Sequence, residues 1–181
     1  MGRQVLLVRH CEVGTECRGL CYGQSDVVLS PAGEEESFRL AALLAERNIT
    51  HLFHSGLRRT SFLAEIVAQE RGIPAVTDSD LRERDFGTWE LRCWNDIYAE
   101  VGSAMEGLLL DPSNYSPPGG ETTFALRNRV LRWYGRLPSD GLIVAITHGG
   151  PIAALRGALT GLATMRWAEL IPAFGSITEL A

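Results

Sequence analysis

The sequence of 181 residues contains no lysine, so all 17 of its basic residues are arginines. This absence excludes a Schiff-base lysine, the lysine of a P-loop and the lysine of a protein kinase. Any fixed positive charge in a functional site is therefore a guanidinium, whose planar fork suits bidentate contacts with phosphate.

The chain also lacks a basic excess and a long apolar run. Its formal net charge is −5, whereas a nucleic-acid-binding surface needs an excess of basic residues. No segment approaches the roughly 20 apolar residues that span a bilayer. Residues 1–8 are too short for the apolar core of a secretory signal. We therefore expect no nucleic-acid or membrane partner, and a cytoplasmic location.

The four cysteines follow no familiar spacing. Cys11, Cys17 and Cys21 are separated by five and three residues, which matches no CxxC zinc pattern. A cysteine-based phosphatase loop has five residues between its cysteine and its arginine, and the corresponding positions here hold Cys17, Gly23 and Val27. Free thiols in a reducing compartment are the simplest interpretation.

What is present indicates one compact α/β domain over residues 1–181. The hydrophobic content of 45% is enough for a sizeable core. Alternating strands and helices predict a three-layer α/β/α sandwich with a mostly parallel central sheet and one antiparallel edge strand. The expected strands are 4–9, 51–54, 75–77, 142–147 and 175–180. The expected helices are 31–48, after the Ser30-Pro31 start signal, and 57–71, 89–110, 121–137 and 151–162.

Two of the expected strands end on a histidine. Residues 4–10 read QVLLVRH and residues 142–150 read LIVAITHGG. Such short apolar runs are typical of buried parallel strands, and ligands bind outside the carboxyl ends of these strands. If the two strands are adjacent, they bring His10 and His148 to one crevice, together with Arg9. Two imidazoles beside a guanidinium favour a phosphoryl group as the ligand.

Four motifs occur in order along the chain: Arg9-His10, Ser55-x-Leu57-x-Arg59, Leu81-x-Glu83-x-x-Phe86-Gly87-x-Trp89-Glu90 and Thr147-His148-Gly149. Together they resemble the histidine phosphatase superfamily, the phosphoglycerate-mutase-like phosphatases, over about residues 4–160. Within the superfamily, the segments 21–26 and 85–90 are most similar to α-ribazole phosphatases of cobalamin biosynthesis.

The resemblance implies a role for each of five residues. His10 would be the nucleophile that becomes a phosphohistidine, and Glu83 would protonate the leaving oxygen and then activate water. Arg9, Arg59 and His148 would hold the non-bridging oxygens, with no metal or cofactor. Physical chemistry agrees, because neighbouring arginines lower the pKa of a histidine and keep it unprotonated, while guanidiniums stabilise the charge of a transferred phosphoryl group.

Several positions are left open. Tyr22, Glu121 and Thr122 are candidates for substrate contact, and Arg58 is an alternative to Arg59 as the phosphate clamp. The family's first motif usually reads Arg-His-Gly-Glu-Thr, with an asparagine three residues later, whereas this chain has Cys11, Val13 and Glu16 at the three differing positions. Cys11 would fill space beside the nucleophile, Val13 removes a hydroxyl, and Glu16 would add a negative charge unless it turns away.

The expected function is hydrolysis of a small phosphorylated metabolite, with α-ribazole 5′-phosphate as the first candidate. A broad-specificity or sugar-phosphate phosphatase and a mutase are alternatives within the same superfamily. A metal-dependent hydrolase built on His10, His54 and His148 with Glu12 or Asp85 is a further alternative, as is a non-catalytic phosphate-binding protein. The oligomeric state is left open.

Overall fold

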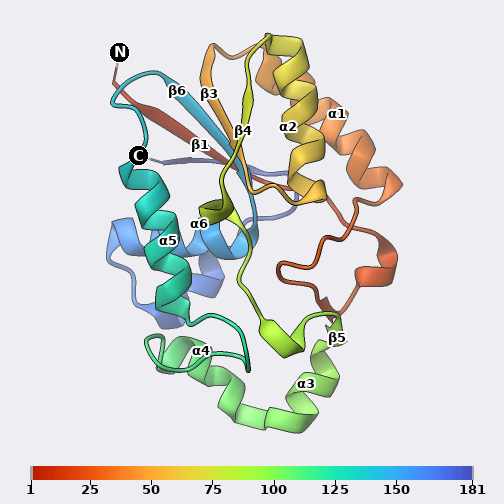
Figure 1. The fold of residues 1–181 in the computed structure, drawn as a ribbon, viewed down its shortest axis with the longest axis vertical. Coiled ribbons are helices and arrows are strands. Elements are labelled where there is room, and N and C mark those ends of the chain that lie inside the picture. Colours follow the sequence, from red (N-terminus) through yellow and green to blue (C-terminus); the bar gives the residue numbers. More distant parts are fainter. Residues whose placement is uncertain (1, 181) are drawn as a thin grey trace.

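The computed structural model describes residues 2–180 and contains a five-stranded sheet between helices (Figure 1). The strands, in the spatial order β4-β3-β6-β1-β7, are β1 (Gln4–Arg9), β3 (Ile49–His54), β4 (Ala75–Thr77), β6 (Leu142–Thr147) and β7 (Ile177–Leu180). Only the edge strand β7 is antiparallel to its neighbour in this sheet. A two-stranded sheet pairs β2 (Leu20–Cys21) with β5 (Arg92–Cys93).

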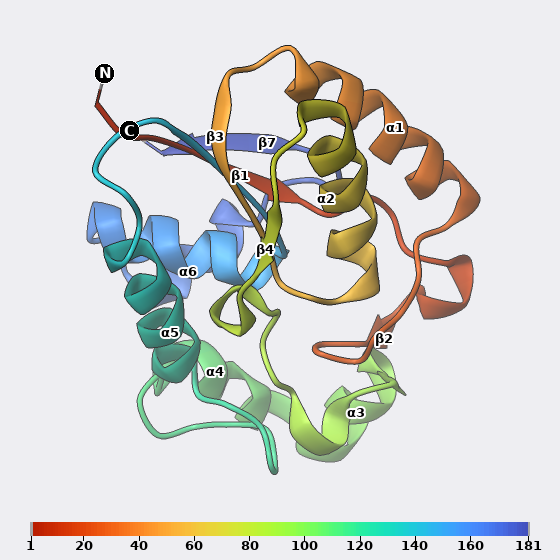
Figure 2. The ribbon, with the colours of Figure 1, turned by 45° about the horizontal axis from the view of Figure 1, so that its top comes forward.

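Helices cover both faces of the sheet (Figure 2). They are α1 (Pro31–Ala45) and α2 (Arg58–Arg71) on one face, and α5 (Thr123–Gly135) and α6 (Gly149–Thr160) on the other. Alternate side chains of β1 point to opposite faces. Leu6 and Val8 therefore pack under α1 and α2, whereas Val5 and Leu7 pack against α5 and α6. The predicted three-layer fold with a mostly parallel sheet is confirmed.

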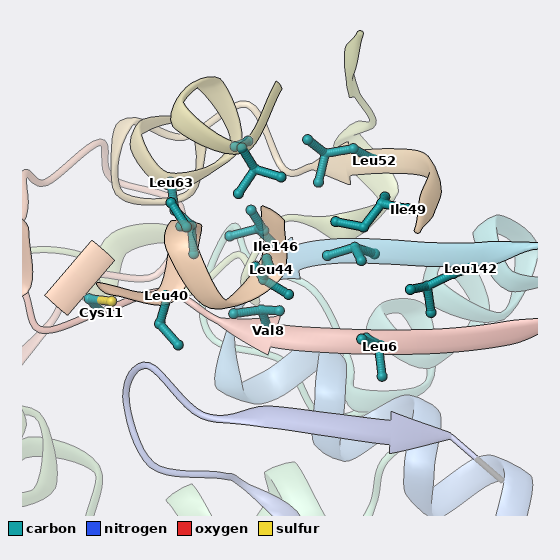
Figure 3. Packing of buried hydrophobic residues seen from close by; sticks show 14 of the residues in the cluster. Leu6, Val8, Cys11, Leu40, Leu44, Ile49, Leu52, Leu63, Leu142 and Ile146 are labelled. Atoms are coloured by element: carbon teal, nitrogen blue, oxygen red, sulfur yellow. The ribbon is translucent and has the colours of Figure 1, made fainter. Parts of the chain in front are cut away.

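Helix α1 packs on the sheet through buried aliphatic side chains. Figure 3 shows Val8 and Ile146, from adjacent strands, facing Leu40 and Leu44 of α1. Ser30 caps the helix as predicted, because its Oγ accepts a hydrogen bond from the Gly33 N–H at 3.0 Å. The helix ends at Ala45 and not at 48, and the ends of the other predicted elements differ by at most two residues, apart from the segment 89–110.

The prediction of one helix over 89–110 is wrong. The segment contains a 3-10 turn at Gly87–Trp89, strand β5, α3 (Trp94–Val101), a 3-10 helix at Gly102–Glu106, and α4 (Gly107–Leu110). Gly102 ends α3 with a φ of +56°, a backbone conformation that residues other than glycine rarely adopt. These pieces lie at the bottom of Figure 1, away from α1 and β7. Among the described residues, no helix has both the length and the apolar character to cross a membrane.

Candidate active site

The site begins where β1 and β6 end. The two strands are adjacent and parallel, with Arg9 opposite Thr147, so the next residue on each is a histidine. The backbone N–H of His10 donates to the Thr147 carbonyl at 3.0 Å, and the rings of His10 and His148 lie 5.1 Å apart, centroid to centroid. Both rings are buried. The two strands therefore deliver their histidines to a common place, as the sequence predicts.

The contacts of His10 leave one ring nitrogen free to react. Its Nδ1 lies 2.8 Å from the carbonyl oxygen of Cys11. Because a carbonyl only accepts hydrogen bonds, Nδ1 carries the proton of the neutral ring and Nε2 keeps its lone pair. Burial and then the charge of Arg59 lower the pKa of His10 to about 3. His10 is therefore a neutral imidazole at physiological pH, which is the form a nucleophile needs.

The second histidine is fixed by a chain of hydrogen bonds. Arg59 Nε–H donates to His148 Nδ1 at 3.2 Å, so the ring proton is on Nε2, which donates to Ser55 Oγ at 2.8 Å. The Ser55 hydroxyl donates to Thr60 Oγ1 at 2.8 Å, since Thr60 donates its own proton to the Leu57 carbonyl, also at 2.8 Å. Burial, followed by the charge of Arg59, holds the pKa of His148 well below its usual value.

Arg59 is a buried cation held by neutral partners. Its Nη1 donates to the Ser25 carbonyl at 2.8 Å and its Nη2 to the Gly23 carbonyl at 2.6 Å, and the residue is 0% exposed. Arg58 is exposed on the same helix. The structure therefore brings Arg59, and not Arg58, to the histidines.

Arg9 is held in a similar way. Its Nη1 donates to the Pro172 carbonyl at 2.6 Å, and its Cζ lies 3.9 Å from the ring centroid of Phe174. Within residues 2–180, Arg9 Nε is buried without a hydrogen-bond partner, and neither Arg9 nor Arg59 has a carboxylate at ion-pair distance. Buried charges are normally paired because leaving water is costly. The buried Arg59 and the half-buried Arg9, neither with a carboxylate partner in the described chain, together indicate a site for an anion.

Glu83 is held next to these groups by backbone amides. Its Oε2 accepts from the Gly150 N–H at 3.1 Å, near the start of α6, and its Oε1 from the Arg84 N–H at 2.8 Å. A Cβ on Gly150 would overlap the Glu83 carboxylate, so the second glycine after His148 is needed for this approach. Within the described chain, Glu83 forms no ion pair with its neighbours Arg82 and Arg84.

A cavity of about 370 Å³ opens beside Glu83. Its walls include Arg9, Tyr22, Glu83, Arg84, Phe86 and Trp94. The ring centroid of Tyr22 lies 5.2 Å from Cζ of Arg59, so this candidate contact residue borders both the cavity and Arg59. A smaller cavity of about 240 Å³ shares Tyr22 and Trp94 and extends along the loop of residues 12–20.

The other two candidate contact residues have partners elsewhere. Glu121 forms an ion pair with Arg129 at 2.6 Å, and Thr122 caps α5 by accepting from the Ala125 N–H at 3.0 Å. Neither lines the two cavities beside Glu83 and Tyr22.

None of the three departures from the family's first motif lines the cavity of about 370 Å³, although Val13 lines the smaller one. Cys11 is 1% exposed and belongs to the core that contains Leu40 (Figure 3). Val13 is buried and pairs with Leu29 in an isolated β-bridge. Glu16 is exposed, and it lines neither cavity. The charges that act on His10 are those of Arg59 and Arg9, and none comes from these three side chains.

Sequence reasoning missed a residue that holds the Glu83 segment in place. Arg129 of α5 donates from Nη1 to the Arg82 carbonyl at 2.6 Å and from Nη2 to the Glu83 carbonyl at 2.8 Å. Gln24 Nε2 donates to the same Glu83 carbonyl at 3.0 Å. Arg129 lies in none of the motifs, and Gln24 lies in the segment 21–26, but only the tertiary fold brings the two residues to Glu83.

The ligand set of the metal-hydrolase alternative is not assembled. Within the part of the chain that the structure describes, no three His, Cys, Asp or Glu side chains form a group that could hold a metal ion. His54 lies at the end of β3, where its Nε2 and the Thr77 hydroxyl are 3.0 Å apart and its Nδ1 accepts from the Gly56 N–H at 3.2 Å.

Comparisons with known proteins agree with this geometry. The chain is similar to a glucosyl-3-phosphoglycerate phosphatase of Mycolicibacterium vanbaalenii, with 31% identity over 93% of this chain and 79% of that protein. It is 33% identical to a probable phosphoglycerate mutase GpmB of Salmonella choleraesuis, over 92% of this chain and 78% of that protein. The crystal structure of an α-ribazole phosphatase from Shigella flexneri superposes with a TM-score of 0.85 at 25% identity, over 98% of this chain and 90% of that one.

The model of the histidine phosphatase superfamily (branch 1) matches residues 5–181. This match covers the strands that carry His10 and His148 and the segments that carry Arg59 and Glu83. The chain belongs to the histidine phosphatase superfamily, whose members are phosphatases or mutases.

Proposed function

We propose that this protein is a phosphomonoesterase that moves the phosphoryl group of a small metabolite to His10 and then to water. One observation carries the proposal: a neutral His10 with a free Nε2 lies near the buried guanidinium of Arg59 and the half-buried guanidinium of Arg9, and neither arginine has a carboxylate at ion-pair distance within the described chain. A phosphate ester provides both the electrophile and the missing negative charge.

In the first step, the Nε2 lone pair of His10 forms a bond to phosphorus while the ester P–O bond breaks. Arg9 and Arg59 hold the non-bridging oxygens. Both ring nitrogens of His148 are engaged by Arg59 and Ser55, so His148 acts by orienting the Arg59 guanidinium and not as a donor to the phosphate. Glu83, protonated at the start, gives its proton to the leaving oxygen. Positioning and charge stabilisation of this kind are most of what phosphoryl transfer requires.

In the second step, water attacks the phosphorus of phosphohistidine. Glu83 takes the proton of the water, the P–N bond breaks, and its electron pair returns to Nε2 of His10. The products are inorganic phosphate, an alcohol and the starting enzyme. No metal or cofactor takes part in this scheme. The comparison with and without EDTA, described below, tests whether a metal ion is needed.

The substrate is a small phosphorylated metabolite. α-Ribazole 5′-phosphate is the first candidate because the segments 21–26 and 85–90 resemble those of α-ribazole phosphatases. Sugar phosphates are the second candidate. Two of the similar proteins are named as phosphatases of small metabolites, one of glucosyl-3-phosphoglycerate and one of α-ribazole, which supports this class of substrate.

The test is hydrolysis of p-nitrophenyl phosphate with and without EDTA, by the wild type and His10→Ala. Turnover that resists EDTA and is lost in the variant supports the proposal and leads to a metabolite screen that starts with α-ribazole 5′-phosphate. Activity that EDTA abolishes indicates a metal-dependent hydrolase. Phosphate binding without turnover of any ester indicates a binding protein, and phosphoryl exchange between metabolites without net phosphate release indicates a mutase.

A further inference from the structure

The segment that precedes β7 is fixed to the catalytic end of β1, which lies beside β7 in the sheet (Figure 2). The Gly175 N–H is shared between the carbonyl oxygens of Arg9 and His10, at 3.2 Å from each. The backbone N–H of Arg9 donates in turn to the Ser176 carbonyl at 3.1 Å. These backbone hydrogen bonds hold the segment against the residue that carries the nucleophile and the arginine before it.

Phe174 is the side chain of this segment that reaches both of these residues. Its ring centroid lies 3.9 Å from Arg9 Cζ and 5.4 Å from the ring centroid of His10. The Phe174 side chain is 41% exposed, and within the described chain it belongs to none of the three clusters of buried hydrophobic residues. Packing in the core therefore does not account for the place of this ring.

Arg9 has few other restraints on its side chain. Its Nη1 donates to the Pro172 carbonyl at 2.6 Å, whereas its buried Nε has no hydrogen-bond partner within residues 2–180. A Cβ on Gly149 would come within 3.4 Å of Arg9 Cζ, so the guanidinium lies close to the backbone that follows His148. A long side chain that must be ordered by its ligand weakens binding, and contacts that order it beforehand remove this cost.

An aromatic ring suits the task of ordering Arg9. The face of a phenyl ring carries partial negative charge and attracts a guanidinium within about 6 Å of its centroid. The ring has no net charge, so it does not neutralise the cation as a carboxylate would. It also takes up no N–H group in a hydrogen bond, which leaves the donors of the guanidinium for phosphate oxygens.

We propose that Phe174 is a positioning residue whose ring holds the Arg9 guanidinium in place for the phosphoryl group that His10 receives. This inference rests on the proposed function, and it adds a residue that lies outside the four sequence motifs. Phe174 acts through Arg9 and takes no part in the transfer of the proton or of the phosphoryl group.

A double-mutant cycle on the hydrolysis of p-nitrophenyl phosphate tests this role. The four proteins are the wild type, Phe174→Leu, Arg9→Met and the double variant, with circular dichroism to verify folding. We expect Phe174→Leu to lower kcat/KM about 10-fold in the wild type, the size of one cation–π contact. In the Arg9→Met background, the same change should cost less than about 2-fold, because the contact is already lost. Effects that simply multiply overturn the assignment.

Further replacements separate the charge of the ring face from the space that the ring fills. Phe174→Tyr keeps the negative face and should stay within about 3-fold of the wild type. Pentafluorophenylalanine at this position has a similar shape but an electron-poor face, so it should lose about as much kcat/KM as Phe174→Leu. Wild-type kcat/KM with the fluorinated ring overturns the assignment. These two replacements also cover the case in which Phe174→Leu does not fold.

Phe38→Leu is the matched control for the loss of an exposed phenylalanine. Phe38 on α1 is 56% exposed, its ring contacts Phe62, and it lines neither of the two cavities beside Glu83 and Tyr22. We expect kcat/KM to stay within about 2-fold of the wild type. A loss as large as that of Phe174→Leu would show that the effect is not specific to the ring on Arg9.

Calorimetric binding of inorganic phosphate to the same four proteins separates this inference from the proposed function. Phosphate meets Arg9 without turnover, so Phe174→Leu should raise the Kd about 5- to 10-fold in the wild type and less than about 2-fold beside Arg9→Met. This pattern without hydrolysis of any ester contradicts the proposed function and supports the positioning role. Hydrolysis by the wild type, with independent effects of the two substitutions on Kd and kcat/KM, overturns the positioning role alone. A wild type that neither binds phosphate nor hydrolyses an ester contradicts both.

Discussion

Arg59 donates its Nε–H to Nδ1 of His148 across 3.2 Å, and this one hydrogen bond sets the state of both residues. It requires His148 to be neutral with its proton on Nε2, because Nδ1 must accept. It also orients the guanidinium, whose Nη1 and Nη2 are held by the backbone carbonyls of Ser25 and Gly23. The phosphate clamp is thus preorganised by neutral groups, which leaves its positive charge for an anion.

The hydroxyl of Ser55 is expected to hold His148 in the tautomer that accepts from Arg59. Ser55→Ala removes the acceptor of the buried Nε2–H, so the ring can rotate or change tautomer. We expect kcat/KM for p-nitrophenyl phosphate to fall about 10-fold, in line with a buried hydrogen-bonding group that loses its partner. Ser61→Ala, at a half-buried position in the first turn of α2 whose hydroxyl does not contact His148, is the control. Equal activity of the two variants would show that the hydroxyl has no such role.

Substitutions of Arg59 and of Arg58 are expected to have very different effects on kcat/KM. Arg59→Met should lower kcat/KM by roughly 10²- to 10³-fold, because it removes a preorganised charge at the phosphoryl group. Arg58→Met changes an exposed side chain and should stay within about 2-fold of the wild type. Steady-state assays of both, with circular dichroism to verify folding, decide between the two clamps. A large loss in Arg58→Met alone would transfer the role to Arg58.

Gly150→Ala is expected to act through Glu83. The new Cβ would overlap the Glu83 carboxylate, so the proton donor must move away from the leaving oxygen. We expect a loss of about 10²-fold with an alkyl phosphate and a smaller loss with p-nitrophenyl phosphate, whose leaving group needs less protonation. Gly135→Ala, where a Cβ meets nothing within 4 Å, should have normal activity. Equal losses with both leaving groups would mean that Gly150 does not act through Glu83.

The buried His10 is expected to make folding stability depend on pH. In the unfolded chain it takes up a proton below about pH 6.5, whereas in the folded protein its pKa is about 3. Between these pH values the unfolded state binds more protons than the folded state. The contribution of the neutral His10 to the free energy of unfolding is therefore complete above pH 6.5 and is lost as the pH falls. The loss is at most about 1.4 kcal/mol per pH unit.

Urea unfolding of the wild type and His10→Gln at pH 7 and pH 5 measures this effect. The free energy of unfolding of the wild type should fall by about 2 kcal/mol more than that of the variant over this interval. An identical fall in both proteins would show that His10 is protonated in the folded state as easily as in the unfolded chain.

The sequence was sufficient for the parts of the site that lie at strand ends. The apolar runs before His10 and His148 predict buried strands, and the adjacent pairing of β1 and β6 then brings both rings together. A second glycine at position 150 also indicates that another group approaches the backbone closely there. In the structure this group is the Glu83 carboxylate.

Other parts of the site depend on tertiary packing and leave no local pattern. Arg129 occurs on a helix like any surface arginine, yet it holds the backbone of the Glu83 segment. Arg84 looks like one member of a charged run, and only the fold shows that it lines the cavity without a carboxylate partner in the described chain. The single helix predicted over 89–110 is not formed because residues Arg92–Cys93 pair as strand β5 and because Gly102, with a positive φ, ends α3.

The most direct test of the central claim is to trap the phosphorylated enzyme. The wild type and His10→Asn are mixed with ³²P-labelled p-nitrophenyl phosphate, quenched in alkali within milliseconds to seconds, and digested for peptide mapping. A label that is stable in alkali, labile in acid, confined to the peptide with His10, formed as fast as turnover and missing in the variant is the predicted result. Wild-type turnover without any labelled protein, or with the label on another residue, would contradict the account.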